Sequence, residues 1–287
     1  MEQIPCDSYL PDNPSAGGNN GGSQSDSGEP DDPGEDEDDD PASIGVDLVP
    51  NLDLTEPEDL ECEYLRKMLG STSIRSEIDF LRRNVDEDDF ERIVEFTEDL
   101  NGVALPKYKA RGTTNVPSVP PRNLPNDIIR RVFIHTHFGG DNGELVPMFS
   151  YSDLEAFLRD VVVVSGRGKD PSEMTSILIA ADVDTIFTYM IKKDPNSSIA
   201  NNYLLHQQQL GMTVADRKAE KDDYEQLLSR ADGQDARERI ALEQLEKMGL
   251  HLYTTSEGLS ELKRLTLNRN NLTNPNDSSL GDPIPCE

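Results

Sequence analysis

The distribution of charge along the chain limits what its first quarter can fold into. Residues 1–65 contain 20 Asp and Glu residues and no Lys or Arg, and the first basic residue is Arg66. The whole chain has 56 acidic and 27 basic residues, so residues 66–287 hold 36 acidic and 27 basic ones, a net charge of −9. The acidic block repels itself and offers little apolar surface to bury. We therefore predict that residues 1–54 are disordered.

Composition narrows the functional classes. Hydrophobic residues make up 34% of the 287 residues and Trp is absent, whereas globular domains usually reach about 45–50%. The sequence has no apolar run near the roughly 20 residues that span a bilayer, and its start does not resemble a signal peptide. A net charge of −29 argues against direct binding to nucleic acid or to an anionic membrane.

The cysteines are few and scattered. Cys6, Cys62 and Cys286 are an odd number with wide spacing. This pattern predicts neither a disulfide framework nor a cysteine-based zinc site, and it fits a reducing compartment.

The acidic block has two interpretations. It acts as a solubilising brush, or it occupies a basic groove on a partner and imitates phosphates there. Ser23, Ser25 and Ser27 are candidate phosphorylation sites, because Ser23 has an acidic residue three positions later. Each phosphate would add about 1.5–2 negative charges.

Residues 55–101 have the pattern of two or three short amphipathic helices. Thr55–Glu58 forms a capping box with Pro57 in the first turn, and apolar residues then recur at helical spacing. These faces either cover each other in a hairpin or order on a partner. We predict that the segment binds a partner through Leu60, Tyr64, Leu65, Met68, Ile74, Ile78 and Leu81.

The remaining chain divides by composition. Residues 102–125 form a Pro-rich linker, and 126–194 have the apolar density of a compact, mainly helical domain, with capping boxes at Ser152–Glu155 and Asp170–Glu173. Val161–Val164 are β-branched and could instead form a strand. Residues 195–202 form a second linker, 203–267 a polar helical region that could oligomerise, and 268–287 a disordered tail. The predicted fold is thus mainly α and modular.

No catalytic pattern stands out, so we predict a protein without enzymatic activity or cofactor. His135 and His137 would share a face on a strand and could bind a metal, but the surrounding residues show no ligand spacing, so no metal is predicted. Ser165–Lys169 lacks the first Gly and the final Ser or Thr of a phosphate-binding loop and is read as a basic turn. Candidate contacts to a carboxylate or phosphate of a partner are Arg130, Arg131, Arg167 and Lys169.

The order of these segments resembles that of the polymerase-cofactor phosphoproteins of negative-strand RNA viruses, particularly rhabdoviruses. Locally, Glu63–Lys67 followed by Ser76–Asp79 is similar to the amphipathic segment with which such phosphoproteins hold unassembled nucleoprotein. The resemblance covers the organisation of the whole chain and almost none of its sequence.

The resemblance implies an acidic adaptor that keeps a basic RNA-binding nucleoprotein soluble and tethers a viral polymerase subunit to its nucleocapsid. It further implies a homo-oligomer in the host cytoplasm or nucleus, or in the virion, without direct contact to nucleic acid or membrane. Two alternatives are a cellular acidic transcriptional adaptor and an acidic chaperone of histone-like basic proteins. Proteins that co-purify with the chain distinguish the three.

Overall fold

The computed structural model describes residues 57–113, 118–138, 146–182, 185–200, 203, 212–268 and 279–286. The chain divides into two compact units, Met1–Leu52 and Asp53–Glu287, and all described residues belong to the second. The predicted disorder of residues 1–54 and the candidate phosphorylation sites Ser23, Ser25 and Ser27 lie outside the described residues.

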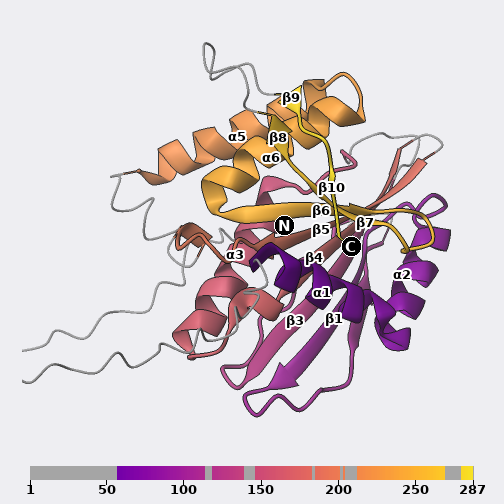
Figure 1. The fold of residues 1–287 in the computed structure, drawn as a ribbon, viewed down its shortest axis with the longest axis vertical. Helices are drawn as coiled ribbons and strands as arrows, with labels where there is room; N and C mark the ends of the chain where they lie inside the picture. Colours follow the sequence, from indigo (N-terminus) through magenta and orange to yellow (C-terminus); the bar gives the residue numbers. More distant parts are fainter. Residues whose placement is uncertain are drawn as a thin grey trace, which may run out of the picture. The chain divides into compact units, whose positions relative to one another are not determined.

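A mixed eight-stranded sheet forms the centre of this unit (Figure 1). The strand order is β10-β7-β6-β5-β4-β3-β1-β2. Only β3 and β4 pair in parallel, and the other neighbouring strands are antiparallel. The strands of this sheet are β1 (Arg92–Asp99), β2 (Tyr108–Arg111), β3 (Ile128–His137), β4 (Thr175–Asp182), β5 (Thr185–Lys193), β6 (Leu250–Thr255), β7 (Leu262–Leu265) and β10 (Ile284–Pro285). A separate pair joins β8 (Leu267–Asn268) to β9 (Ser279–Leu280).

Helices cover both faces of the sheet and make three layers (Figure 1). On one face, α1 (Pro57–Gly70) and α2 (Thr72–Asn84) pack Leu65 and Ile78 against Ile134 and Ile177. On the other face lie α3 (Tyr151–Gly166), α5 (Val214–Arg230) and α6 (Gln234–Met248). The short 3-10 helix η1 (Pro171–Glu173) precedes β4. Consecutive residues of β4 alternate between the two cores.

The prediction of a mainly α fold is wrong. The end of the helical pattern predicted for residues 55–101 is β1, and the domain predicted to be mainly helical, residues 126–194, contains β3, β4 and β5. Asp170 does cap a turn, but only η1 follows it. Seven of the eight residues of β4 are buried, so apolar residues in this strand do not alternate with polar ones. The periodicity of such a continuous apolar run does not distinguish a buried strand from a buried helix.

The helices that the sequence predicted correctly are those with one solvent-facing side. Helices α1 and α2 cover much of the helical pattern read in residues 55–101. Helix α3 carries the predicted apolar face, although its capping box is formed by Ser150 and Asp153, two residues before the predicted one. Val161–Val164 belong to this helix and not to a strand.

Strands from three predicted segments meet in the one sheet. Strand β1 pairs with β3, and β5 pairs with β6. Backbone hydrogen bonds of the sheet therefore connect three segments that were predicted to be separate: residues 55–101, 126–194 and 203–267. The Pro-rich segment contains edge strand β2 and returns along β1, where Val119 and Arg122 donate backbone hydrogen bonds to Glu91 and Glu95. Within the predicted disordered tail, residues 279–286 contain β9 and β10.

A disulfide joins Cys62 of α1 to Cys286 beside β10, with 5.2 Å between the two Cα atoms. This pair contradicts the expectation that the cysteines form no disulfide, and the inference of a reducing compartment loses its basis. Sequence reasoning missed the pair because the two cysteines are 224 residues apart in the sequence, and only the folded chain brings them together. Among the described residues, no helix combines the length and apolar character needed to cross a bilayer.

The disulfide predicts the number of reactive thiols. Protein prepared without reductant and unfolded in denaturant should expose Cys6 alone, and reduction should expose all 3 cysteines. Cys62→Ser should free Cys286 and raise the unreduced count by one. A thiol assay combined with peptide mapping measures this. An unreduced preparation in which Cys62 and Cys286 both react would contradict the pairing.

Lys192 of β5 is fully buried beneath α1. Its ammonium group lies 3.9 Å from the centroid of the Tyr64 ring and donates to the carbonyl of Ser172. Burial lowers the pKa of Lys192 to about 8, although Glu61, Glu173 and Asp170 oppose this shift.

This shift predicts a pH-dependent stability. Between about pH 8 and the unfolded pKa of 10.5, the unfolded chain binds more protons at Lys192 than the folded chain, so the free energy of unfolding should rise with pH. The full rise is about 3 kcal/mol. Burial raises the pKa of Tyr64 to about 12. Above about pH 10, Tyr64 therefore ionises in the unfolded chain before it ionises in the folded one, which lowers the free energy of unfolding. The effect of Lys192 is therefore measured below pH 10. Lys192→Met should flatten the rise in urea titrations at pH 7–9.5, and an unchanged slope would contradict this account.

Candidate functional site

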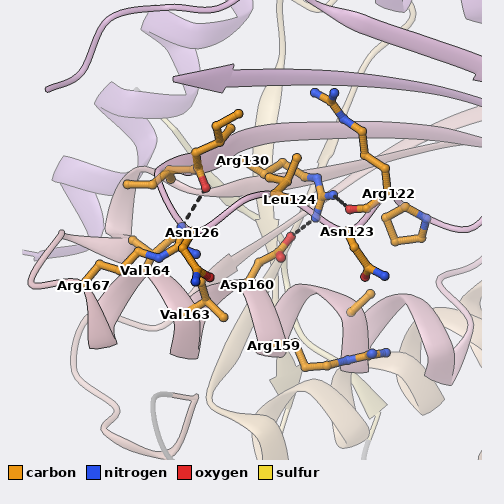
Figure 2. A pocket seen from close by; sticks show the side chains of 14 residues that line it. Arg122, Asn123, Leu124, Asn126, Arg130, Arg159, Asp160, Val163, Val164 and Arg167 are labelled. Carbon is orange, nitrogen blue, oxygen red and sulfur yellow. Dashed lines mark hydrogen bonds and ion pairs between the residues drawn. The ribbon is translucent and has the colours of Figure 1, made fainter. Parts of the chain in front are cut away.

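A hollow of about 280 Å³ lies between the C-terminal half of α3, the start of β3 and residues 121–126 (Figure 2). The fold creates it because α3 follows β3 and packs back across the sheet toward the beginning of that strand. Arg167, just after α3, donates from Nη1 to the carbonyl oxygen of Ile128 at 2.7 Å. This bond fixes one wall of the hollow. Four of its lining side chains are arginines: Arg122, Arg130, Arg159 and Arg167.

Arg130 forms the floor of the pocket and is only 5% exposed. Its Nη1 pairs with Asp160 of α3, and its Nη2 lies 3.1 Å from Glu95 and 2.6 Å from the carbonyl oxygen of Arg122. Glu95 is fully buried and also pairs with the Arg122 guanidinium. Burial raises the pKa of the Asp160 carboxyl, although Arg130 opposes this shift. Since most of its donors have partners, Arg130 is an internal anchor and not a free binding group.

Arg159 and Arg167 differ from Arg130 in their partners. Arg159 donates from Nε to the carbonyl oxygen of Glu155 at 3.4 Å, and Arg167 bonds a carbonyl as described above. Within the described residues, neither guanidinium forms an ion pair with a carboxylate. Figure 2 shows the Arg159 and Arg167 side chains apart from each other, with Val163 between them. Their eight-residue separation corresponds to about 12 Å along the helix axis.

The pocket therefore has an excess of positive charge, whereas the chain as a whole is negatively charged. Its four arginines face two carboxylates, Asp160 in the wall and Glu95 behind it. A larger hollow of about 840 Å³ beside α2 has two arginines and four acidic side chains, so it has no such excess. A concave site with unneutralised guanidinium groups is suited to carboxylate or phosphate groups.

Two of the four predicted basic contacts meet in this pocket. Arg130 and Arg167 line it together. Arg131 lies elsewhere, 2.7 Å from a carboxylate oxygen of Glu98 and 2.9 Å from the carbonyl oxygen of Asp170. Lys169 is a partly buried residue of the turn after α3. Sequence reasoning missed Arg122 and Arg159, because only the packing of α3 and residues 121–126 around the start of β3 brings them to one hollow.

The predicted partner-binding stripe of α1 and α2 lies mostly inside the fold. Leu65, Met68, Ile78 and Leu81 are buried in the core beneath these helices. Tyr64 and Ile74 are partly buried against the same core, and Leu60 is 55% exposed. The sheet of the same chain thus covers the faces for which a partner was expected.

A second polar cluster lies at the opposite end of α3. His135 and His137 project from β3, as the strand pattern suggested, and Asp153 projects from the first turn of α3. Both histidines are 3% exposed. Oδ2 of Asp153 lies 3.4 Å from Nε2 of each histidine. Sequence reasoning missed this grouping because only the return of α3 over β3 brings Asp153 to the histidine pair.

The charges in this cluster depend on one another. Burial opposes the charged form of Asp153, but His135 and His137 outweigh it, and the pKa of the Asp153 carboxyl lies well below its ordinary value. Burial also opposes protonation of His137, but Asp153 and Glu91 outweigh it and raise the pKa of His137. These three side chains could hold a cation.

No protein-family model and no curated protein matches this chain.

Proposed function

We propose that the chain is a non-catalytic binding protein whose arginine-lined pocket takes an acidic peptide segment of a protein partner. The observation that carries this proposal is the pair Arg159 and Arg167. Both residues line one hollow, and neither guanidinium forms an ion pair with a described carboxylate. In a chain with a net charge of −29, an unneutralised positive pair is a specific feature of the surface.

The dimensions of the pocket define the ligand. The backbone positions of Arg159 on α3 and Arg167 just after it are about 12 Å apart along the helix axis, which is close to four residues of extended peptide at about 3.3 Å each. Val163, which is 43% exposed, and Leu124 lie within the same hollow. The matching ligand has two acidic side chains four positions apart with an apolar residue between them.

A nucleic acid is the less favoured ligand. Nucleic-acid binding needs a basic stripe that neutralises several phosphates in succession. In the pocket, the four arginines gather around one hollow of about 280 Å³ and do not form a stripe. The charge of the surrounding chain would repel a polyanion, whereas a short acidic peptide has to satisfy only the local site.

The adaptor role expected from the sequence is compatible with this proposal but is not the same claim. In that role the acidic block of residues 1–54 holds a basic nucleoprotein, and a further module tethers a polymerase subunit. The block lies outside the described residues, and that role stays a prediction. The arginine-lined pocket adds a contact of the opposite sign, as an adaptor with two partners would need.

The proposal predicts the effect of removing the two charges. A fluorescein-labelled peptide containing Glu-Ser-Leu-Ser-Glu should bind the full chain, with an affinity that falls as salt rises. Arg159→Ala combined with Arg167→Ala should weaken binding at least about 10-fold, because hydrogen bonds to charged groups contribute about 1.5–3 kcal/mol each. Fluorescence anisotropy measures the dissociation constants.

Arg66→Ala is the matched control. Arg66 is exposed on α1 and donates from Nε to the carbonyl four residues earlier at 3.4 Å, as Arg159 does. The Arg66→Ala variant should bind the peptide as the wild type does. Thermal melting should show that this variant and the double arginine variant both fold. Equal binding by the double variant would contradict the proposal. A single-stranded RNA oligonucleotide that binds in place of the peptide, and depends on the same two arginines, would assign the pocket to nucleic acid instead.

A further inference from the structure

We infer that His135, His137 and Asp153 form a zinc site that fastens the end of β3 to the start of α3. This inference is independent of the arginine-lined pocket and of the peptide proposed to bind there. The three ligand atoms lie within 4.8 Å of one another.

The distances in the cluster fit a metal better than a direct ion pair. A charge-assisted N–H···O hydrogen bond has a donor–acceptor distance of about 2.7–2.9 Å, whereas Nε2 of each histidine lies 3.4 Å from Oδ2 of Asp153. Two ligands of a tetrahedral zinc ion with bonds of about 2.0–2.1 Å are about 3.4 Å apart. Within the part of the chain that the structure describes, neither ring nitrogen of the buried His135 has a hydrogen-bond partner.

Neighbouring groups orient two of the ligands. Nδ1 of His137 lies 3.0 Å from the carbonyl oxygen of Val146. A proton on that nitrogen leaves the Nε2 lone pair directed toward Asp153, and such an outer hydrogen bond is usual for histidines that bind metals. Asp153 is held by the capping box of α3: its Oδ2 accepts from the Ser150 backbone at 2.8 Å, and its own N–H donates to Ser150 Oγ.

Glu91 completes the charge balance. Its Oε2 accepts a hydrogen bond from the Val119 backbone, and its Oε1 lies 4.0 Å from Nε2 of His137. Two neutral imidazoles with the Asp153 and Glu91 carboxylates offset the two charges of a zinc ion. The ligand set of imidazole nitrogen and carboxylate oxygen suits zinc, and water or Glu91 supplies the fourth ligand.

The burial of the histidines assigns the ion a structural role. His135 and His137 are each 3% exposed, so the ion would be shielded from bulk solvent. It would connect a strand of the central sheet to the first turn of the helix that borders the arginine-lined pocket. Because only the folded chain brings the ligands together, zinc binding should stabilise the fold.

The test uses the full chain, stripped of metal with a chelator, and zinc chloride as the only added ligand. Competition with a chromophoric chelator should reveal one tight zinc site per chain. His137→Gln should weaken it by more than the roughly 10–100-fold typical of outer-shell changes. Asp153→Asn keeps an oxygen for the Ser150 N–H and so preserves the cap, yet it should also weaken zinc binding. Zinc should raise the melting temperature of the wild type and not that of either variant.

His251→Gln is the matched control, because His251 also contacts carboxylates, with its Nδ1 2.8 Å from Glu61, but lies outside the cluster. It should leave the tight site unchanged, and weak zinc binding by the acidic block is common to every variant. Cobalt(II) in place of zinc should give the intense visible absorption of tetrahedral coordination. Histidines that only pack in the core and bind no metal would not give this absorption. A wild type without a tight site, or a loss no greater in His137→Gln than in His251→Gln, would overturn the inference.

Discussion

The parallel pairing of β3 with β4 is the constraint on which both candidate sites depend. A tight turn cannot connect two parallel strands. The chain must therefore leave the C-terminal end of β3 and return to the opposite end of the strands before β4 begins. Helix α3 makes that return and packs Leu154, Phe157 and Leu158 into the core. Its first turn consequently lies by the end of β3, and its last turn lies by the beginning.

Each end of this β3–α3 unit holds polar groups that a purely structural core would not need. A column of side chains along β3 links them: the Arg130 guanidinium lies 5.5 Å from the Phe133 ring centroid, and the rings of Phe133, His135 and His137 follow at 5.2 Å intervals. The carboxylates of Glu95 and Glu91 approach this column from β1 and the residue before it. The proposed peptide pocket and the proposed zinc site are therefore two ends of one framework, and a metal at one end would stiffen the wall of the other.

The sequence predicts the outer layers of this fold better than its centre. The apolar positions of α3 leave a local signal because a surface helix has one polar side. Strands β4 and β5 face helices on both sides and lose the alternation that identifies strands. Of the sites, the sequence yields Arg130, Arg167 and the two histidines one by one. Asp153, Arg122 and the Cys62–Cys286 pair depend on contacts between distant segments, and no local pattern encodes them.

Native-state hydrogen exchange tests the central claim, that the described residues between 57 and 286 fold as one unit around β3–α3–β4. The account predicts that amides in the central parts of β1, β3 and β6 exchange through the same global opening, with one denaturant dependence, since the strands belong to one continuous sheet. Helix α3 should open with them. Protection that persists in residues 126–194 while β1 and β6 exchange freely would show separate modules, and it would contradict the account.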